Sequence, residues 1–296
     1  MGFCDMRIQK KDIIAWLCLA AATLAALVLI SARLCETHLS VRYYEVASEK
    51  IMEPLRIVQL TDLHGHVFGE ANAELAELVA EQQPDLIVMT GDMLDKTDAD
   101  ASVVCELIRA LQDVAPIYYC HGNHEKTWMA STGIDLDSQL TEAGAIVLDT
   151  AFADITVNGQ PLRIGGYHGY YRYWGMLTKS KEQWAAEDAF SDAFEDTEQF
   201  KLLLCHSPTG WIDWSLIDRA PVDLVLTGHY HGGQIRIPFI GGLYAPYVGF
   251  FPKYTEGMFG GEMGTAILST GLSTSRGIPR INNLPQVVVV DLVPAQ

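Results

Sequence analysis

Short apolar runs alternate along the first half of the chain with segments of helical periodicity. The apolar runs predict strands at residues 39–47, 55–60, 86–89 and 116–120. The periodic segments, residues 71–81 and 101–111, predict amphipathic helices. The last three of these strands end in polar residues, and α/β proteins bind ligands at the carboxyl ends of their strands. We therefore expect polar side chains to gather at one edge of a sheet.

The second half of the chain has shorter apolar runs and less helix. They predict strands at residues 145–148, 153–157, 162–164, 201–204, 222–226 and 286–293. Asn158-Gly159 predicts a hairpin turn between two of them. The whole pattern favours an α/β fold in which two sheets face each other with helices outside, a four-layer αββα sandwich. An open doubly wound sheet is the alternative that periodicity leaves open.

The amino-terminal apolar run, residues 13–30, is longer than any other and contains no charge. At about 1.5 Å rise per residue this run spans roughly 27 Å, close to the hydrocarbon thickness of a bilayer. We expect residues 1–34 to form a short cytoplasmic tip and an uncleaved transmembrane helix. A cleaved signal peptide is the alternative, but it would have a shorter apolar region and small residues at its exit.

The charges that flank the apolar run predict its direction in the membrane. Arg7, Lys10 and Lys11 precede it, and Arg33 and Arg42 follow it. Because positive residues stay on the cytoplasmic side, this modest excess places the amino terminus in the cytoplasm. We expect a single-pass protein of the cell membrane whose main domain is extracytoplasmic.

Composition excludes one class of partner. The chain has 20 Lys and Arg against 37 Asp and Glu, a formal net charge of −17 at pH 7. Such a surface repels polyanions, so we expect no nucleic-acid partner. The six cysteines fall at positions 4, 18, 35, 105, 120 and 205. Because most lie in the predicted anchor, helices or strands, they indicate buried thiols rather than a disulfide framework.

Side chains able to bind a metal follow five of the predicted strands. They are Asp62 and His64, Asp92, Asn123 and His124, His206, and His229 and His231. A single histidine at a strand end is usually an ordinary loop residue, but five such clusters together indicate a site. Mixed carboxylate, imidazole and amide ligands suit Mn²⁺, Fe²⁺ or Zn²⁺ better than Ca²⁺, which prefers oxygen alone.

The clusters fall within short motifs. These are Asp-x-His at 62–64, Gly-Asp-x-x-Asp at 91–95, Gly-Asn-His-Glu at 122–125, the isolated His206 and Gly-His-x-His at 228–231. Their set and order resemble the signature of the calcineurin-like metallophosphoesterase superfamily. Three further motifs, at 232–236, 249–254 and 271–275, resemble its membrane-associated bacterial YkuE/YaeI-like branch. The resemblance implies a metallophosphoesterase domain over residues 55–296, preceded by a linker and first strand at 35–54.

The resemblance also implies a pair of divalent metal ions. One would be bound by Asp62, His64 and His231, the other by Asn123, His206 and His229, with Asp92 bridging the two. A shared carboxylate fits this arrangement because two cations a few ångströms apart otherwise repel strongly. We expect Mn²⁺, with Fe, Zn or Mg as alternatives.

A hydroxide that bridges two metals can attack phosphorus in line while the metals neutralise the phosphoryl oxygens. His124 adjoins Asn123, and we expect it to protonate the leaving oxygen or to stabilise the transition state. The resemblance implies that Asp95 orients His124. The alternative for Asp95 is a cap at the start of the following helix.

Residues 167–200 form the most individual part of the chain. Aromatic residues, among them Tyr170 and Trp174, precede a segment that mixes Phe190 and Phe194 with acidic residues. This composition indicates either a solvated amphipathic helix packed on the sandwich or a cap over the site.

Together with the predicted anchor, the resemblance implies a membrane-anchored enzyme that hydrolyses phosphodiester or pyrophosphate bonds, and we expect a cell-envelope or lipid-linked substrate. The first alternative is a phosphomonoesterase of broad specificity. The second is a binding protein that retains the fold without turnover, which the full set of ligands and His124 disfavours.

Overall fold

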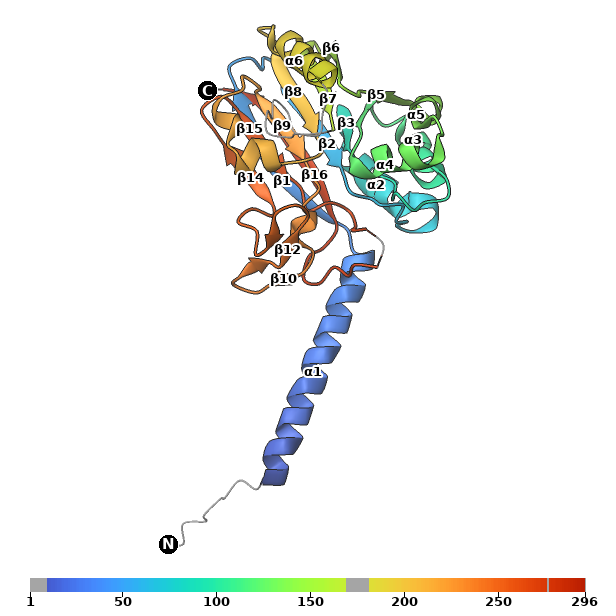
Figure 1. Cartoon of the computed structure of the whole chain (residues 1–296), viewed down its shortest axis with the longest axis vertical. Helices are drawn as coiled ribbons and strands as arrows, with labels where there is room; N and C mark the ends of the chain where they lie inside the picture. The colour runs from blue at the N-terminus through green and yellow to red at the C-terminus, as the bar shows by residue number, and fades with distance from the viewer. Residues whose placement is uncertain (1–9, 169–180, 276, 296) are drawn as a thin grey trace.

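The computed structural model describes residues 10–168, 181–275 and 277–295. Two six-stranded sheets pack face to face, and helices cover their outer surfaces (Figure 1). The predicted four-layer sandwich is therefore confirmed, and the open doubly wound alternative is wrong.

The first sheet has the order β1-β16-β2-β3-β4-β5. Its strands are β1 (Ser40–Ser48), β2 (Leu55–Leu60), β3 (Leu86–Thr90), β4 (Ile117–Cys120), β5 (Ala145–Val147) and β16 (Gln286–Pro294). β2, β3 and β4 run parallel to one another. Their carboxyl ends therefore meet at one edge of the sheet, as their sequences predict.

The second sheet has the order β14-β15-β9-β8-β7-β6. Its strands are β6 (Ala151–Val157), β7 (Gln160–Tyr167), β8 (Phe200–Cys205), β9 (Leu224–Thr227), β14 (Gly257–Gly260) and β15 (Thr265–Leu268). Asn158 and Gly159 join β6 to β7 with φ of 51° and 83°, which confirms the predicted hairpin turn. The apolar pattern gave no prediction of β14 and β15.

Helices α2 (Ala73–Glu81), α3 (Ser102–Leu111), α4 (Asn123–Thr132) and α5 (Leu136–Ala143) pack on the first sheet. Helix α6 (Lys181–Glu195) packs on the second, where Phe190 and Phe194 are buried. This part of the 167–200 segment therefore belongs to the sandwich. The aromatic residues between Tyr170 and Trp174 lie outside the described residues.

The core between the sheets is apolar, with side chains such as Ile57, Val88, Leu204 and Leu226 fully buried. Near the site this core also contains the buried polar side chain of Gln59. Its amide nitrogen donates to Thr90 Oγ1 in its own sheet and to the Thr227 carbonyl in the other. This pair of bonds ties the carboxyl ends of the two sheets together.

Helix α1 (Lys10–Thr37) projects from the domain (Figure 1). An eighteen-residue window has a mean hydropathy of 2.7 and is not buried in the structure, so the helix is long and apolar enough to cross a membrane. Its last turns contact the domain. Asn282 N–H donates to Ser31 Oγ at 2.7 Å, and Cys35 is buried.

Candidate metal centre

The loops that follow β2, β3, β4, β8 and β9 converge where the two sheets meet. Backbone bonds join the first two loops, since Asp62 N–H donates to the Gly91 carbonyl and His64 N–H to the Asp92 carbonyl, both at 3.0 Å. In the second sheet, Gly228 N–H donates to the His206 carbonyl at 3.0 Å. The structure thus brings all seven predicted metal ligands into one region.

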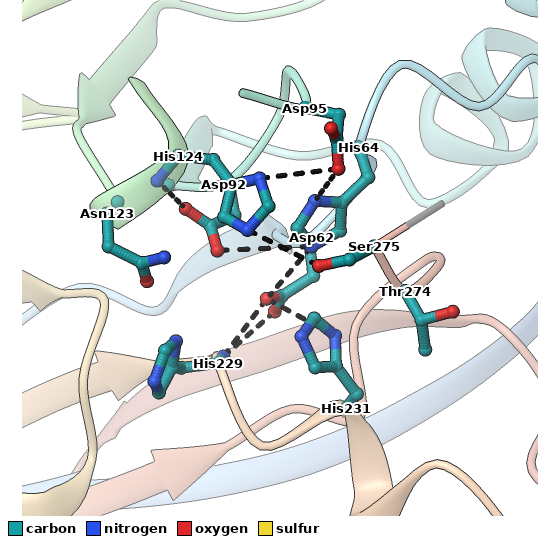
Figure 2. A network of polar contacts seen from close by, with 12 residues as sticks. Asp62, His64, Asp92, Asp95, Asn123, His124, His229, His231, Thr274 and Ser275 are labelled. Atoms are coloured by element: carbon teal, nitrogen blue, oxygen red, sulfur yellow. Dashed lines mark hydrogen bonds and ion pairs between the residues drawn. The ribbon is translucent and has the colours of Figure 1, made fainter. Parts of the chain in front are cut away.

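The first group consists of Asp62, His64 and His231, whose side chains face one another (Figure 2). One ligand atom from each lies within 4.8 Å of the other two. His64 Nε2 is 4.0 Å and His231 Nδ1 is 3.6 Å from the same carboxylate oxygen of Asp62. These three residues could hold one metal ion.

The second group consists of Asp92, His206 and His229, which also meet the 4.8 Å distance. His206 Nε2 is 3.0 Å from Asp92 Oδ2 and 3.0 Å from His229 Nδ1. His206 Nδ1 donates to the Thr90 carbonyl at 2.8 Å, which fixes the ring and turns Nε2 toward the group. Asn123 points into the same space (Figure 2).

Asp92, a member of the second group, also contacts the first group through His64. Its Oδ2 is 3.0 Å from His206 Nε2 and 3.9 Å from His64 Nε2. Its Oδ1 accepts a hydrogen bond from His124 N–H at 2.8 Å. One carboxylate therefore touches both groups of ligands, as a bridging ligand must.

The donor atoms of the centre are not all satisfied by hydrogen bonds to one another, and a metal ion would satisfy those that remain. His64 Nε2 and Asn123 Oδ1 are buried and have no hydrogen-bond partner among the described residues. Buried polar atoms are rarely left in this state, and a metal ion at each group of ligands would satisfy them. The mixed oxygen and nitrogen donors suit a borderline divalent ion.

The backbone of the centre is strained. Five of the seven predicted ligands have positive φ: Asp62 (56°), His64 (49°), Asp92 (52°), His229 (70°) and His231 (49°). Residues other than glycine seldom adopt such angles, and those that do cluster at functional sites. Gly122 and Gly228 allow the close packing, because a Cβ there would collide with Asp92 Oδ1 and Asp62 Oδ2 respectively.

Charge is distributed unequally among the histidines. Burial opposes the charged form of His206, but the facing Asp92 carboxylate raises its pKa to about 10. Burial and the neighbouring His206 lower the pKa of His229 to about 3. Burial likewise holds the pKa of His231 well below its usual range. His229 and His231 are therefore neutral and ready to bind a cation, whereas His206 must first lose a proton.

His124 adjoins the centre, and Asp95 lies behind it. Asp95 Oδ2 is 3.3 Å from His124 Nδ1 and 3.5 Å from His64 Nδ1, so it contacts two rings. His124 Nδ1 also accepts a hydrogen bond from the Lys96 backbone N–H at 3.0 Å. That bond requires a lone pair on Nδ1, so the neutral ring carries its proton on Nε2. Burial lowers the pKa of His124, which favours this neutral form.

Glu125, the last residue of the Gly-Asn-His-Glu motif, has a role that was not predicted. Its buried carboxylate accepts hydrogen bonds from the backbone N–H groups of Asp92, Met93, Leu94 and Gly122 and from the Tyr119 hydroxyl. It therefore fixes the loop that carries Asp92 against the loop that carries Asn123. In the sequence, the fixed place of Glu125 in the motif was the only signal that could have indicated this role.

Ser275 was likewise missed. Its hydroxyl lies 3.3 Å from His124 Nε2, and it lines a cavity of about 250 Å³ together with His64, Gly65 and Thr274. The Gly-Leu-Ser-Thr-Ser motif at 271–275 contains it. This cavity therefore reaches the first ligand group at His64.

The model of the calcineurin-like phosphoesterase family matches residues 55–233, more than half of the chain. The protein belongs to this family. It is 29% identical to the phosphodiesterase YaeI of Escherichia coli (strain K12), over 81% of this chain and 83% of YaeI. It is 28% identical to the metallophosphoesterase YkuE of Bacillus subtilis (strain 168), over 80% of this chain and 78% of YkuE. The predicted family and branch are thus confirmed.

Among solved structures, a dimetal phosphatase from Danio rerio aligns with a TM-score of 0.42 at 11% identity. The alignment covers 74% of this chain and 88% of that one. Family membership implies divalent metal ions and hydrolysis of a phosphoester.

Replacing Glu125 with Gln should weaken metal binding. The amide NH₂ would face backbone N–H donors, so the loops around Asp92 would lose their common acceptor. We expect Mn²⁺ affinity to fall about 10- to 100-fold, the loss typical of residues that orient metal ligands. Isothermal titration calorimetry measures the Mn²⁺ affinity. Glu142→Gln is the control, because Glu142 is exposed. Equal affinities in the two variants would contradict this role.

Metal affinity should rise with pH. His206 holds its proton below about pH 10, so a metal bound there displaces one proton. We expect the affinity of this group for Mn²⁺ to increase about tenfold per pH unit between roughly pH 6 and 8. Titrations in two buffers of different ionisation enthalpy would count the protons released. His206→Asn should flatten the dependence, and an affinity independent of pH in the unmodified protein would refute the assignment.

Proposed function

We propose that the protein is a membrane-anchored phosphoesterase with two metal ions that hydrolyses phosphodiester or pyrophosphate bonds. The observation that carries this proposal is the contact of Asp92 with both groups of ligands. Asp62, His64 and His231 would hold one ion, and Asn123, His206 and His229 the other. Mn²⁺ is the ion we favour, with Fe, Zn or Mg as alternatives.

When bound, the pair of ions supplies the positive charge that activates water and neutralises phosphoryl oxygens. The protein supplies position and protons. His124 is the catalytic residue we assign outside the metal ligands, because its ring packs on His64 and its Nε2 lies 3.3 Å from the Ser275 hydroxyl. The Lys96 N–H holds its ring in place by donating to Nδ1, and Asp95 lies 3.3 Å from the same nitrogen. Nε2–H can donate to the leaving oxygen or to a phosphoryl oxygen.

A diester is the preferred substrate class because YaeI, a relative over most of the chain, is named a phosphodiesterase. Helix α1 supports a substrate of the cell envelope. Its apolar run can anchor the domain, and the excess of positive residues before the run favours an extracytoplasmic domain. A lipid-linked phosphodiester or pyrophosphate meets both conditions.

The Mn²⁺-loaded full chain in detergent should hydrolyse bis(p-nitrophenyl) phosphate faster than p-nitrophenyl phosphate. Asp92→Asn removes the negative charge shared by the two groups and should lower the rate by about two to three orders of magnitude, a loss typical of one preorganised electrostatic group. Release of p-nitrophenolate measures both rates. A preference for the monoester would favour the broad phosphomonoesterase instead.

His124→Ala should lower kcat about 10²- to 10⁴-fold, the range for general acid–base catalysis, while both metal ions remain bound. The loss should be greater for an alkoxide leaving group than for p-nitrophenolate if His124 protonates the leaving oxygen. Equal losses would assign it to the phosphoryl oxygens. A metal-loaded protein that hydrolyses neither ester, and in which His124→Ala changes nothing, would indicate a binding protein.

A further inference from the structure

Exposed apolar side chains of the described catalytic domain gather in one short segment. Residues 239–251 contain seven large ones. Phe239 is fully exposed, Tyr247 is 75% exposed and Phe250 is 72% exposed. Soluble surfaces carry such residues singly, so a cluster of this kind marks a contact surface.

The segment forms two small hairpins. Strands β10 (Arg236–Ile237) and β11 (Gly241–Gly242) make the first, and β12 (Tyr244–Ala245) and β13 (Gly249–Phe250) make the second. The exposed apolar residues occupy the two turns and the strands beside them. We call residues 236–251 the aromatic hairpins.

The aromatic hairpins lie beside the end of α1 that enters the domain. Asn282 links the two, because its N–H donates to Ser31 Oγ at 2.7 Å and its Nδ2 donates to the Arg236 carbonyl at 3.1 Å. Ser31 directly follows the apolar run of α1, and Arg236 opens β10. Figure 1 shows β10 and β12 at the end of the domain from which α1 projects. A bilayer spanned by α1 would therefore reach the hairpins.

A cavity of about 590 Å³ separates α1 from the first hairpin. Leu27, Ile30 and Leu34 of α1 form an apolar wall, and Arg236 and Glu256 contribute to a polar wall on the domain. The latter two form an ion pair of 2.6 Å. The apolar wall continues the apolar surface of α1, and the polar wall faces it. This change from apolar to polar matches the boundary between the acyl chains and the headgroups of a bilayer.

The hairpins also reach the metal centre. The ring of Tyr247 stacks on His229, with centroids 5.4 Å apart and planes inclined by 16°. The aromatic hairpins therefore contact both the end of α1, through Asn282, and a predicted metal ligand.

We propose that the catalytic domain docks on the bilayer through the aromatic hairpins, with apolar side chains of residues 239–251 inserted at the lipid–water interface. This inference rests on the membrane anchoring in the proposed function. Aromatic rings suit the site because they settle at the level of the headgroups. Since the net charge of −17 opposes attraction to anionic lipids, apolar insertion provides the contact. Docking turns the metal centre toward phosphoesters carried by lipids.

Fluorescent labels on the full chain in phosphatidylcholine vesicles test this proposal. Cys4 and Cys18 are replaced with Ser, and the other four native cysteines are buried. A nitrobenzoxadiazole label is then placed through Ile240→Cys, Phe250→Cys or the control Met52→Cys. Met52 is 64% exposed and follows β1, whose nine residues run roughly 30 Å away from the end of α1.

We expect the labels at positions 240 and 250 to emit at shorter wavelength than the label at 52. Spin-labelled lipid should quench them about twofold more, because interfacial side chains lie roughly 5–10 Å into the headgroup boundary. A circular dichroism spectrum like that of the unmodified chain checks that each variant is folded, and neither this check nor the depth measurement depends on turnover.

Equal quenching at all three positions, in a chain that floats with the vesicles, would overturn docking while leaving the anchor and the activity intact. A chain that does not float would overturn the anchoring, and docking with it. Deep labels at 240 and 250 in a protein that hydrolyses no ester would support docking and contradict only the phosphoesterase.

Discussion

One buried carboxylate, that of Asp92, contacts ligands from both sheets, and much of the surrounding structure holds it there. A buried anion is costly unless it is paired, and here the charged form of His206 pairs with it. A second buried carboxylate, Glu125, sets the position of the Asp92 backbone by accepting bonds from four backbone N–H groups and one hydroxyl. The centre therefore contains one carboxylate, Asp92, that is placed to bind metal, and another, Glu125, that positions the backbone of Asp92.

The two sheets contribute different parts of this arrangement. Acidic residues come from the first sheet, through Asp62 and Asp92, whereas His206, His229 and His231 come from the second. Each half is incomplete without the other. Gln59 joins them directly behind the site, with bonds to both sheets. The geometry of the centre thus depends on how the sheets pack, as well as on the local loops.

Much of this could be predicted from the sequence because strand ends are visible in it. Apolar runs followed by Asp62, Asp92 or His206 mark both the strand and the place where it stops. The positive φ angles of five ligands could not be predicted, because tertiary contacts impose them against local preference. The partners of Glu125 were hidden for a related reason, since four of its five bonds go to backbone groups, which have no sequence signature. Strand β14, Gly257–Gly260, has two glycines among four residues and so lacks a strand-like composition.

The position of β16 in the first sheet has a consequence for folding. This last strand lies between β1 and β2, pairing residues 286–294 with residues 40–48 and 55–59. Contacts of such sequence separation form late, because the closure of a long loop is entropically costly. The first sheet therefore cannot be completed before β16 has been synthesised. Ser273 N–H donates to the Asp62 carbonyl, and the segment after Ser273 leads into β16, so this segment contacts the backbone of the first ligand group. A chain that stops before β16 would therefore leave β1 without its partner strand, and β2 paired only with β3, in the sheet that carries Asp62.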